Sequence, residues 1–228
     1  MTDKESARLI WRNLHTSNTV VPHWGKAAEK LRAHRLYRNA ATVFATPGKS
    51  LHQARINCLV DGKSLIMPAP SIRKGFFLLP ARTIPFKDIS VAVTYKGLSK
   101  HGTLLKNNAF PELSVELLLT DSIAIDHEGG RIGDGGGFFD LCCALLYELG
   151  SLQQNPAVLT FVLEEQISRE QLPQDTWDIK MTGAITPVKA HAFTPQLQKP
   201  QIYWDLLPQD RIKRIDPLWK IYYARIKA

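Results

Sequence analysis

A run of glycines between residues 129 and 137 is the part of the chain with the clearest potential for chemistry. Six glycines lie within these nine residues, and an apolar segment, Phe138 to Leu149, follows directly. Glycine has no Cβ, so such a run suits backbone that takes a positive φ or lies close to a ligand. Consecutive backbone N–H groups in such a loop can form an anion-binding concavity, and the start of a helix adds its positive dipole end. These residues therefore indicate an anion site, with phosphate as the natural ligand.

The neighbours of the glycine run extend this interpretation. Arg131 lies inside the run and Asp140 follows it, which offers a cation for phosphate and a carboxylate for a metal ion. The preceding segment, residues 115–125, is apolar enough to be a buried strand. Strand, glycine loop and helix together are the layout of a nucleotide-phosphate site. The spacing fits neither the Rossmann nor the P-loop fingerprint, and a glycine loop can also serve simply as a connection.

The elements that must position this loop alternate between strands and helices. Alternation of this kind predicts an α/β fold in which helices cover both faces of a mostly parallel sheet. We expect Ser50 to cap a helix that begins at Leu51. The apolar pattern predicts helices over residues 3–15, 24–39 and 51–60, and strands over residues 41–45, 64–67, 89–94, 115–125, 157–163 and 179–185.

The end of the chain differs in composition from the rest. From Thr194 the sequence is rich in Pro and Gln and loses the alternation. We therefore expect an α/β domain over residues 1–190 and a C-terminal extension over residues 191–228, packed on that domain or extending from it. The stretch 216–228 mixes aromatic residues with Lys and Arg and is expected to be a docked helix or arm.

Length and composition exclude several classes of protein. The chain has 228 residues, of which 44% are hydrophobic, which is enough for one sizeable core. No apolar run approaches the roughly 18 to 20 residues of a membrane span, and the first residues lack a signal-peptide pattern. The three cysteines are an odd set without the spacing of a structural bridge or a zinc site. We expect a cytoplasmic protein with no membrane segment.

The net charge of +8 is unevenly distributed. Residues 1–110 carry 18 Lys and Arg against 5 Asp and Glu, whereas residues 111–228 carry 11 against 16. A basic half suits polyanionic ligands such as a nucleoside triphosphate, a polyglutamate tail or RNA. A solvated basic surface is the alternative for most of these residues taken singly.

The ordered motif around the glycine run resembles the signature of the 5-formyltetrahydrofolate cyclo-ligase family. It reads Ile125-Asp126, then Gly-Gly-Arg-Ile-Gly-Asp-Gly-Gly-Gly-Phe-Phe-Asp over residues 129–140. Further similar motifs occur in the order of the family, so the resemblance spans roughly residues 4 to 187. These are Lys4-Glu-Ser-Ala-Arg8, Asp61-Gly-Lys-Ser-Leu-Ile-Met-Pro68, Gly75-Phe76, Phe161 to Gln166 and Pro173 to Asp178.

This resemblance implies a compact three-layer α/β fold, related to the ribose-5-phosphate isomerase and CoA-transferase folds. It implies an enzyme that uses ATP and Mg²⁺ to close 5-formyltetrahydrofolate to 5,10-methenyltetrahydrofolate. The formyl oxygen attacks the γ-phosphorus, and N10 then attacks the activated carbon and expels phosphate. Positioning and charge neutralisation do most of the work in such a reaction.

The resemblance also assigns roles to residues of this chain. Lys4, Arg8 and Arg131 would neutralise the phosphates, with Arg131 as the catalytic cation, and Phe76 would help to form the wall of the pterin site. Asp140 and Asp178 would hold Mg²⁺. The residues expected to surround the phosphates are Gly133, Asp134, Gly135, Gly136, Gly137 and Phe138.

Three departures from the family pattern concern the substrate. Asp134 places a carboxylate beside the expected phosphates, and Leu141 replaces a cation after Asp140. No acidic residue lies between Val43 and Val60, where the family has a pterin-reading Glu. These departures resemble the divergent methenyltetrahydrofolate synthetase domain-containing branch, with which the chain shares Ile10-Trp11, the run from Pro68 to Gly75 and the run from Lys199 to Trp204.

Three functions therefore stay open. The first is cyclo-ligase activity on 5-formyltetrahydrofolate. The second is an ATP-dependent reaction on a different small heterocycle, favoured by the missing Glu. The third is a non-catalytic protein whose basic segment from Lys26 to Arg38 binds RNA or a protein partner.

Some side chains near the loop have alternative roles of their own. Asp126 is a candidate to brace the loop instead of touching a ligand. Asp140 could satisfy the helix dipole in the first turn instead of binding metal. Cys142 and Cys143 could gain thiolate character from the same dipole, or could be buried and inert.

Overall fold

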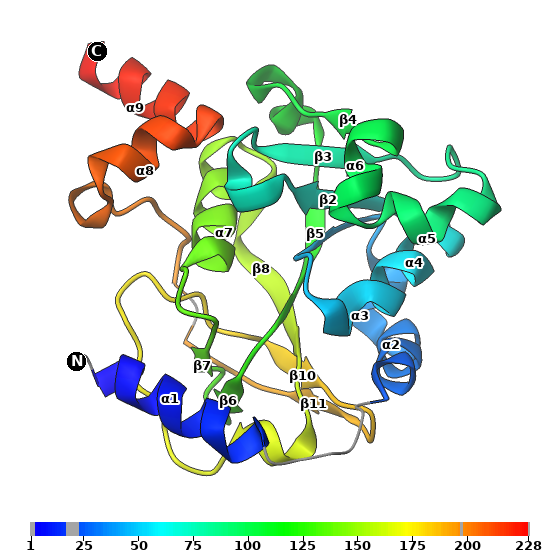
Figure 1. Cartoon of the computed structure of the whole chain (residues 1–228), viewed down its shortest axis with the longest axis vertical. Coiled ribbons are helices and arrows are strands. Elements are labelled where there is room, and N and C mark those ends of the chain that lie inside the picture. Colours follow the sequence, from blue (N-terminus) through cyan, green and yellow to red (C-terminus); the bar gives the residue numbers. More distant parts are fainter. Residues whose placement is uncertain (1–2, 17–22, 197, 228) are drawn as a thin grey trace.

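The computed structural model describes residues 3–16, 23–196 and 198–227 (Figure 1). No helix among these described residues is both long and apolar enough to cross a bilayer. The helices are α1 Asp3–Thr16, α2 Trp24–Ala33, α3 Arg35–Asn39, α4 His52–Val60, α5 Ile89–Ala92, α6 Tyr95–His101, α7 Phe138–Glu148, α8 Gln209–Arg214 and α9 Asp216–Lys227. The strands are β1 Thr42–Ala45, β2 Ser64–Pro68, β3 Phe76–Leu79, β4 Thr103–Leu104, β5 Val115–Asp121, β6 Ala124–Asp126, β7 Arg131–Ile132, β8 Leu152–Phe161, β9 Ile167–Ser168, β10 Gly183–Ile185 and β11 Ala190–Ala192.

The main sheet has the order β11-β10-β8-β5-β1-β2-β3-β4. Its centre is parallel, because β10, β8, β5, β1 and β2 pair in parallel, whereas β11, β3 and β4 add antiparallel strands at the two edges. Phe44 of β1 lies opposite Ile66 of β2 and Leu118 of β5. The expected mostly parallel sheet is confirmed.

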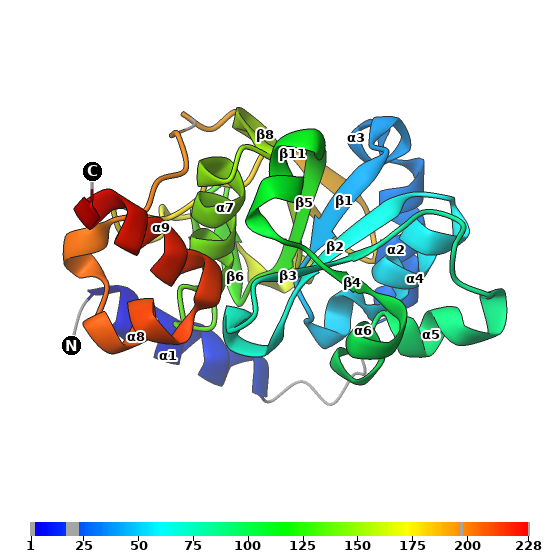
Figure 2. The same ribbon diagram turned by 90° about the horizontal axis from the view of Figure 1, so that it is seen from above.

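Helices cover both faces of this sheet, as successive side chains of a strand point to opposite faces. Val43 and Ala45 belong to one core cluster, which packs under α2, α4, α5 and α6. Phe44, between them in sequence, belongs to the other cluster, which packs against α7, α8 and α9. Figure 2 shows these two helical layers on either side of the strands. The expected three-layer α/β fold is therefore confirmed.

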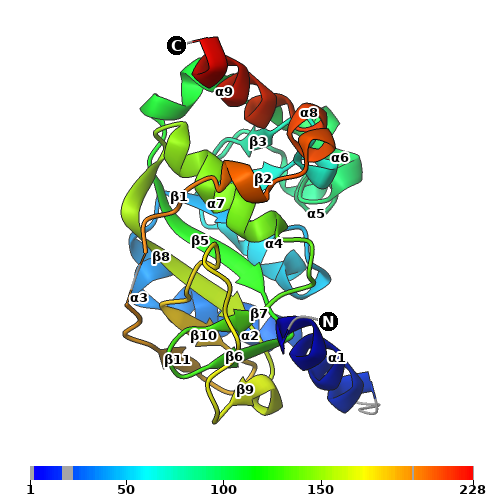
Figure 3. The same cartoon turned by 90° about the vertical axis from the view of Figure 1, so that its left-hand side faces the viewer.

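A small second sheet, with the order β7-β6-β9, lies beyond the end of β5. The segment 115–125, expected as one strand, is divided between the two sheets at Ser122, whose Oγ lies 2.7 Å from Thr160 Oγ1. Ala7 and Trp11 of α1 pack against Ala124 and Ile132 of the small sheet. Figure 3 shows α1 beside β6 and β7. This packing brings the first helix to the side of the glycine run.

Three further sequence predictions are corrected. In the segment 89–94, expected as a strand, residues 89–92 form α5, and Ile89, Ala92 and Val93 are buried at helical spacing. The helix expected over residues 24–39 is broken at His34, which has extended backbone and accepts a hydrogen bond from Leu36 N. Ser50 does not cap a helix, since its hydroxyl donates to Asp121 Oδ2 at 2.6 Å.

The C-terminal segment packs on the same core. Three residues of this segment are buried in the core cluster beneath α7: Ile212 of α8, Leu218 of α9, and Ile215 between the two helices. The main chain is also tied down, because Asp216 N donates to Arg73 O at 2.9 Å. The helix expected over residues 216–228 is present as α9 up to Lys227, and residue 228 lies outside the described residues.

Candidate functional site

Residues 133–137 of the glycine run form the loop between β7 and α7, and the first two glycines of the run precede β7. Gly135 and Gly137 have φ values of +98° and +59°, in the left-handed region that favours glycine. A Cβ on Gly135 would also lie only 2.9 Å from Arg8 Cζ. The glycines at these two positions therefore allow both the turn and the close approach of α1.

Hydrogen bonds from two helices hold the carbonyl groups of this loop. Arg8 Nε of α1 donates to Gly133 O at 3.0 Å, and Arg211 Nη2 of α8 donates to Gly136 O at 2.7 Å. Asp134 stabilises the turn from within, because its Oδ1 accepts a hydrogen bond from Gly136 N at 2.9 Å. Its carbonyl accepts one from Arg12 at 2.9 Å. The extra carboxylate that departs from the family motif is thus part of the loop's own structure.

Arg131 and Asp140 form a buried ion pair at the base of the loop. Arg131 Nη2 lies 3.0 Å from Asp140 Oδ2, and both side chains are less than one-tenth exposed. Asp140 Oδ1 accepts a hydrogen bond from Ile179 N at 3.0 Å. The Arg131 guanidinium also lies 4.8 Å above the Phe139 ring. Its Nε is buried and has no hydrogen-bond partner among the described residues.

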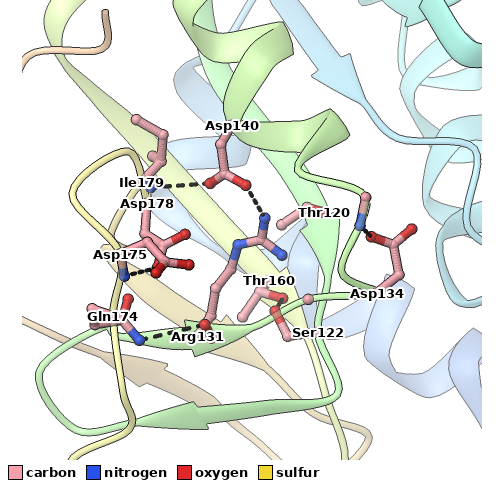
Figure 4. Close-up of polar contacts among 12 residues, drawn as sticks. Thr120, Ser122, Arg131, Asp134, Asp140, Thr160, Gln174, Asp175, Asp178 and Ile179 are labelled. Atoms are coloured by element: carbon pink, nitrogen blue, oxygen red, sulfur yellow. Dashed lines mark hydrogen bonds and ion pairs between the residues drawn. The ribbon is translucent and has the colours of Figure 1, made fainter. Parts of the chain in front are cut away.

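A second group of charges lies beside this pair (Figure 4). Buried Lys4 of α1 forms an ion pair with Asp178 and lies 3.2 Å from Asp175 Oδ2. Asp178 Oδ2 also accepts a hydrogen bond from Asp175 N at 2.7 Å. Burial raises the pKa of Asp178, and the charge of Asp140 acts in the same direction, while Lys4 opposes both. Figure 4 shows these acids on one side of Arg131 and Asp134 on the other.

The donor set fits a hard divalent cation in one respect. Asp140 and Asp178 provide carboxylate oxygens next to each other, and Mg²⁺ in nucleotide sites is commonly held by one or two carboxylates with phosphate oxygens and water. No cluster of three or more metal-ligating side chains is present among the described residues.

Two cavities adjoin the loop. The first cavity has a volume of about 300 Å³ and the second about 580 Å³, both within the usual range of ligand sites. The first is lined by Lys4, Glu5, Arg8, Arg131, Gly133 to Gly137, Asp140, Leu141, Ala144, Asp175, Trp177, Asp178, Gln201, Tyr203, Leu206, Leu207 and Arg211. The second is lined by Thr46 to Lys49, Pro68 to Ile72, Tyr95, Thr120, Asp121, Arg131, Asp134, Phe138, Phe139 and Cys142. Arg131 and Asp134 line both.

Polar groups in the second cavity come from the turn after β1 and from the end of β5. Thr46 Oγ1 is buried and has no hydrogen-bond partner among the described residues. The Asp121 carboxylate packs directly on this turn, because a Cβ on Gly48 would lie 2.1 Å from its Oδ2. Buried Arg55 fixes the turn by donating to the carbonyl oxygens of Thr46 and Gly48 at 2.7 and 2.9 Å. Burial lowers the pKa of Arg55 to about 10.

The structure brings most of the expected site residues together. Phe138 lines the second cavity, and Phe76 is the exception: its side chain is 0% exposed and its ring packs edge to face on those of Phe44 and Phe110. It lies in the core and lines neither cavity, so the expectation that it forms a substrate wall is corrected. The expected site residues that line the first cavity are Lys4, Arg8, Arg131, Gly133, Asp134, Gly135, Gly136, Gly137, Asp140 and Asp178.

Other residues of the site were missed by the sequence analysis. Asp121 is the last residue of the buried parallel strand β5, and a polar residue at the carboxyl end of such a strand is a signal that could have identified it. Trp177 lies within a motif that we used only for Asp178. Tyr203 and Arg211 come from the Pro- and Gln-rich segment, in which no pattern indicated a contact with the loop.

The alternative roles proposed for three neighbouring residues can also be compared with the structure. Asp126 braces the turn before β7, because its carboxylate accepts hydrogen bonds from the N–H groups of Glu128, Gly130 and Leu172. Cys142 and Cys143 are buried, and burial, with the nearby charge of Asp140, raises the pKa of both thiols. The inert alternative for these cysteines is therefore favoured.

Comparison with known proteins agrees with this architecture. The model of the 5-formyltetrahydrofolate cyclo-ligase family matches residues 9–187. The methenyltetrahydrofolate synthase domain-containing protein of Danio rerio is 26% identical over 202 residues, which cover 86% of this chain and 52% of that protein. The 5-formyltetrahydrofolate cyclo-ligase of Haemophilus influenzae is 28% identical over 158 residues, covering 68% of this chain and 78% of the enzyme.

Solved structures support the fold. The structure of 5,10-methenyltetrahydrofolate synthetase from Aquifex aeolicus superposes with a TM-score of 0.56 at 17% identity, covering 89% of this chain and 99% of that one. The chain spans about half the length of the domain-containing relatives that it matches. The family match, which covers well over half of the residues, nonetheless identifies the chain as a member of the 5-formyltetrahydrofolate cyclo-ligase family.

Proposed function

We propose that this protein is an ATP- and Mg²⁺-dependent enzyme that closes 5-formyltetrahydrofolate to 5,10-methenyltetrahydrofolate. The observation that carries the proposal is that the two cavities meet at Arg131 and Asp134. A reaction in which ATP activates a second substrate needs two binding sites that share a boundary at the transferred phosphoryl group. The first cavity suits the nucleotide and the second the reduced folate.

The first cavity suits a triphosphate because of how its charges and backbone are arranged. The glycine loop leads into α7, an 11-residue helix whose positive dipole end adjoins the cavity. Lys4, Arg8 and Arg131 contribute cations. Mg²⁺ held by Asp140 and Asp178 would neutralise phosphate charge.

Arg131 is the residue we assign to the transferred group. Its ion pair with Asp140 and the face of Phe139 fix the guanidinium, while its buried Nε has no partner in the described part of the chain. A buried donor of this kind is unfavourable unless a ligand satisfies it. A phosphoryl oxygen at the boundary of the two cavities would accept this hydrogen bond, and the fixed positive charge would stabilise the negative charge that develops there.

A different small heterocycle is the alternative substrate. The part of the second cavity formed by residues 46–49 contains Lys49 and no carboxylate, and the nearby carboxylate comes from Asp121 on β5. A substrate in the second cavity would therefore find its carboxylate acceptor on β5, whereas the family pattern has a Glu between positions 43 and 60. A ring with another arrangement of donors would satisfy it better.

The decisive experiment is the absorbance of methenyltetrahydrofolate on mixing folded protein with 5-formyltetrahydrofolate, ATP and Mg²⁺. We expect ATP-dependent turnover. Failure to turn over at saturating substrate would rule out the folate reaction. If binding of ATP with Mg²⁺ persisted in the same preparation, the result would instead support the alternative heterocycle, and a thermal-shift screen with ATP present would identify its class.

A further inference from the structure

The first cavity has a wall that lies outside the family match. The match ends at residue 187, whereas Gln201, Tyr203, Leu206, Leu207 and Arg211 all line the cavity. Tyr203 Oη donates to Thr176 O at 2.9 Å and so joins this segment to the loop that carries Asp178. The wall thus contacts a part of the site that the family motif defines.

This wall is anchored in the core. Ile212 is completely buried in the cluster beneath α7, and Ile215 and Leu218 follow it there. Figures 1 and 3 both show α8 and α9 beside α7. Pro217 packs so closely on Gly75 that a Cβ there would lie 3.3 Å from it. The position of Arg211, one residue before Ile212, is therefore set by packing.

Arg211 occupies a position equivalent to that of Arg8 on the other side of the loop. Its Nη2 donates to Gly136 O at 2.7 Å, and its Cζ lies 4.9 Å from the centre of the Phe138 ring. Lys4 and Arg131, in contrast, are paired with carboxylates. A guanidinium has five N–H donors, so a single bond to Gly136 leaves donors for a ligand in the cavity.

The charge balance gives this residue particular weight. The lining of the first cavity contains five carboxylates, from Glu5, Asp134, Asp140, Asp175 and Asp178, and four cations, of which Arg211 is one. Without it, three cations would face five carboxylates and a polyphosphate. Guanidinium groups match phosphate oxygens with paired donors, which an ammonium cannot do.

We propose that Arg211 is a phosphate-binding residue of the nucleotide site and that residues 201–211 form the wall that completes it. The proposal rests on the proposed function, since it requires a nucleoside triphosphate in the first cavity. The chemistry it specifies is recognition of the β- and γ-phosphate charge by a residue outside the family signature.

Calorimetric binding of ATP and of AMP, each with Mg²⁺, tests this in the full chain. We expect Arg211→Gln to weaken ATP binding about tenfold or more while AMP affinity changes less than about twofold, because one lost charge-assisted contact has an effect of this order. Arg211→Lys, which keeps the charge but not the fork, should lie between Gln and the native residue. Arg214→Gln, at an exposed position of the same helix, is the matched control and should bind both as the native protein does.

Two outcomes would overturn the inference. One is native ATP affinity in Arg211→Gln, and the other is an equal loss of ATP and AMP affinity, which would indicate a purely structural wall. ATP binding by the native protein and by Arg8→Gln, measured in parallel, distinguishes failure of the Arg211 inference from failure of the proposed function. If the native protein binds no ATP, the proposed function fails with it, whereas loss in Arg8→Gln alone would reject only the role of Arg211.

Discussion

The two cavities beside the glycine loop are built in different ways. Around the first cavity, charged side chains are already paired with one another or with main-chain groups, as in Arg131 with Asp140 and Lys4 with Asp178. Around the second, Thr46 Oγ1 has no partner among the described residues, and Asp121 belongs to the end of a strand. The contrast teaches that the charges around the first cavity are held in place by existing ion pairs, whereas the second cavity keeps a buried hydroxyl that a bound ligand would satisfy.

The largest effect is expected from Arg131→Gln, because Arg131 lines both cavities. Removing one partner of a buried ion pair leaves Asp140 uncompensated and should lower the free energy of unfolding by about 3–5 kcal/mol. Loss of the fixed cation should lower kcat by about 100- to 1000-fold. Denaturant unfolding and the methenyltetrahydrofolate assay measure the two effects. Arg169→Gln, at an exposed position, is the control, and near-native kcat in Arg131→Gln would contradict the assigned role.

Gly135→Ala should disturb the first cavity, which we propose for the nucleotide, and leave the second cavity unchanged. The added Cβ would lie 2.9 Å from Arg8 Cζ, and the residue would hold a φ of +98° that alanine adopts poorly. We expect stability to fall by about 1–3 kcal/mol and ATP affinity to fall about tenfold. Affinity for the second substrate, measured without nucleotide, should stay within about twofold of the native value. Unchanged ATP binding would show that the loop conformation does not matter for the nucleotide.

Gly48→Ala is the corresponding change in the second cavity, which we propose for the second substrate. A Cβ there would lie 2.1 Å from Asp121 Oδ2, so the carboxylate must move and its hydrogen bond with Ser50 is disturbed. We expect a stability loss of about 1–3 kcal/mol and a severalfold higher KM for the second substrate, with ATP affinity preserved. Gly25→Ala, where a Cβ meets nothing within 4 Å, should be neutral or slightly stabilising. Equal losses of ATP and substrate binding would show that the two sides are not separable.

The smallest effect expected is at the cysteines. Burial raises the pKa of Cys58 to about 12, and also raises the pKa of Cys142 and Cys143. Few thiolates are therefore present near pH 8, and iodoacetamide should label none of the three in the native protein within an hour but all three after unfolding. Mass spectrometry counts the labels. Rapid labelling of Cys142 would mean that the second cavity opens to solvent beside α7.

The sequence motifs identified most residues that line the first cavity, but few of those that line the second. Arg131, Asp140 and Asp178 could be predicted because their residue types and order follow a specific pattern, and the structure places all three along one cavity. Phe76 could not, because whether a strand residue faces the core or a cavity depends on the packing of Phe44 and Phe110 around it. Arg211 reaches the site only through the packing of α8 on the core.

Secondary structure shows the same division. The parallel strands and the helix after the glycine loop were predicted, although the strand expected over residues 179–185 is confined to β10, Gly183–Ile185. The strand prediction for residues 89–94 was wrong. A short run with β-branched residues is typical of a strand, but the buried positions of this run have helical spacing. The break at Ser122 depends on a contact with Thr160, 38 residues away, which no local pattern contains.

The two arginines that hold the glycine loop have a consequence for how the protein is made. Arg8 bonds a residue 125 positions later in the chain, and Arg211 bonds one 75 positions earlier. On a ribosome, the sheet and α7 can assemble well before residue 211 emerges, so a nascent chain would carry a folded core and an incomplete site. Contacts between such distant residues form slowly, because a long loop must close first. Under the proposed function, nucleotide binding should therefore appear only after Arg211 has emerged and α8 has packed on the core.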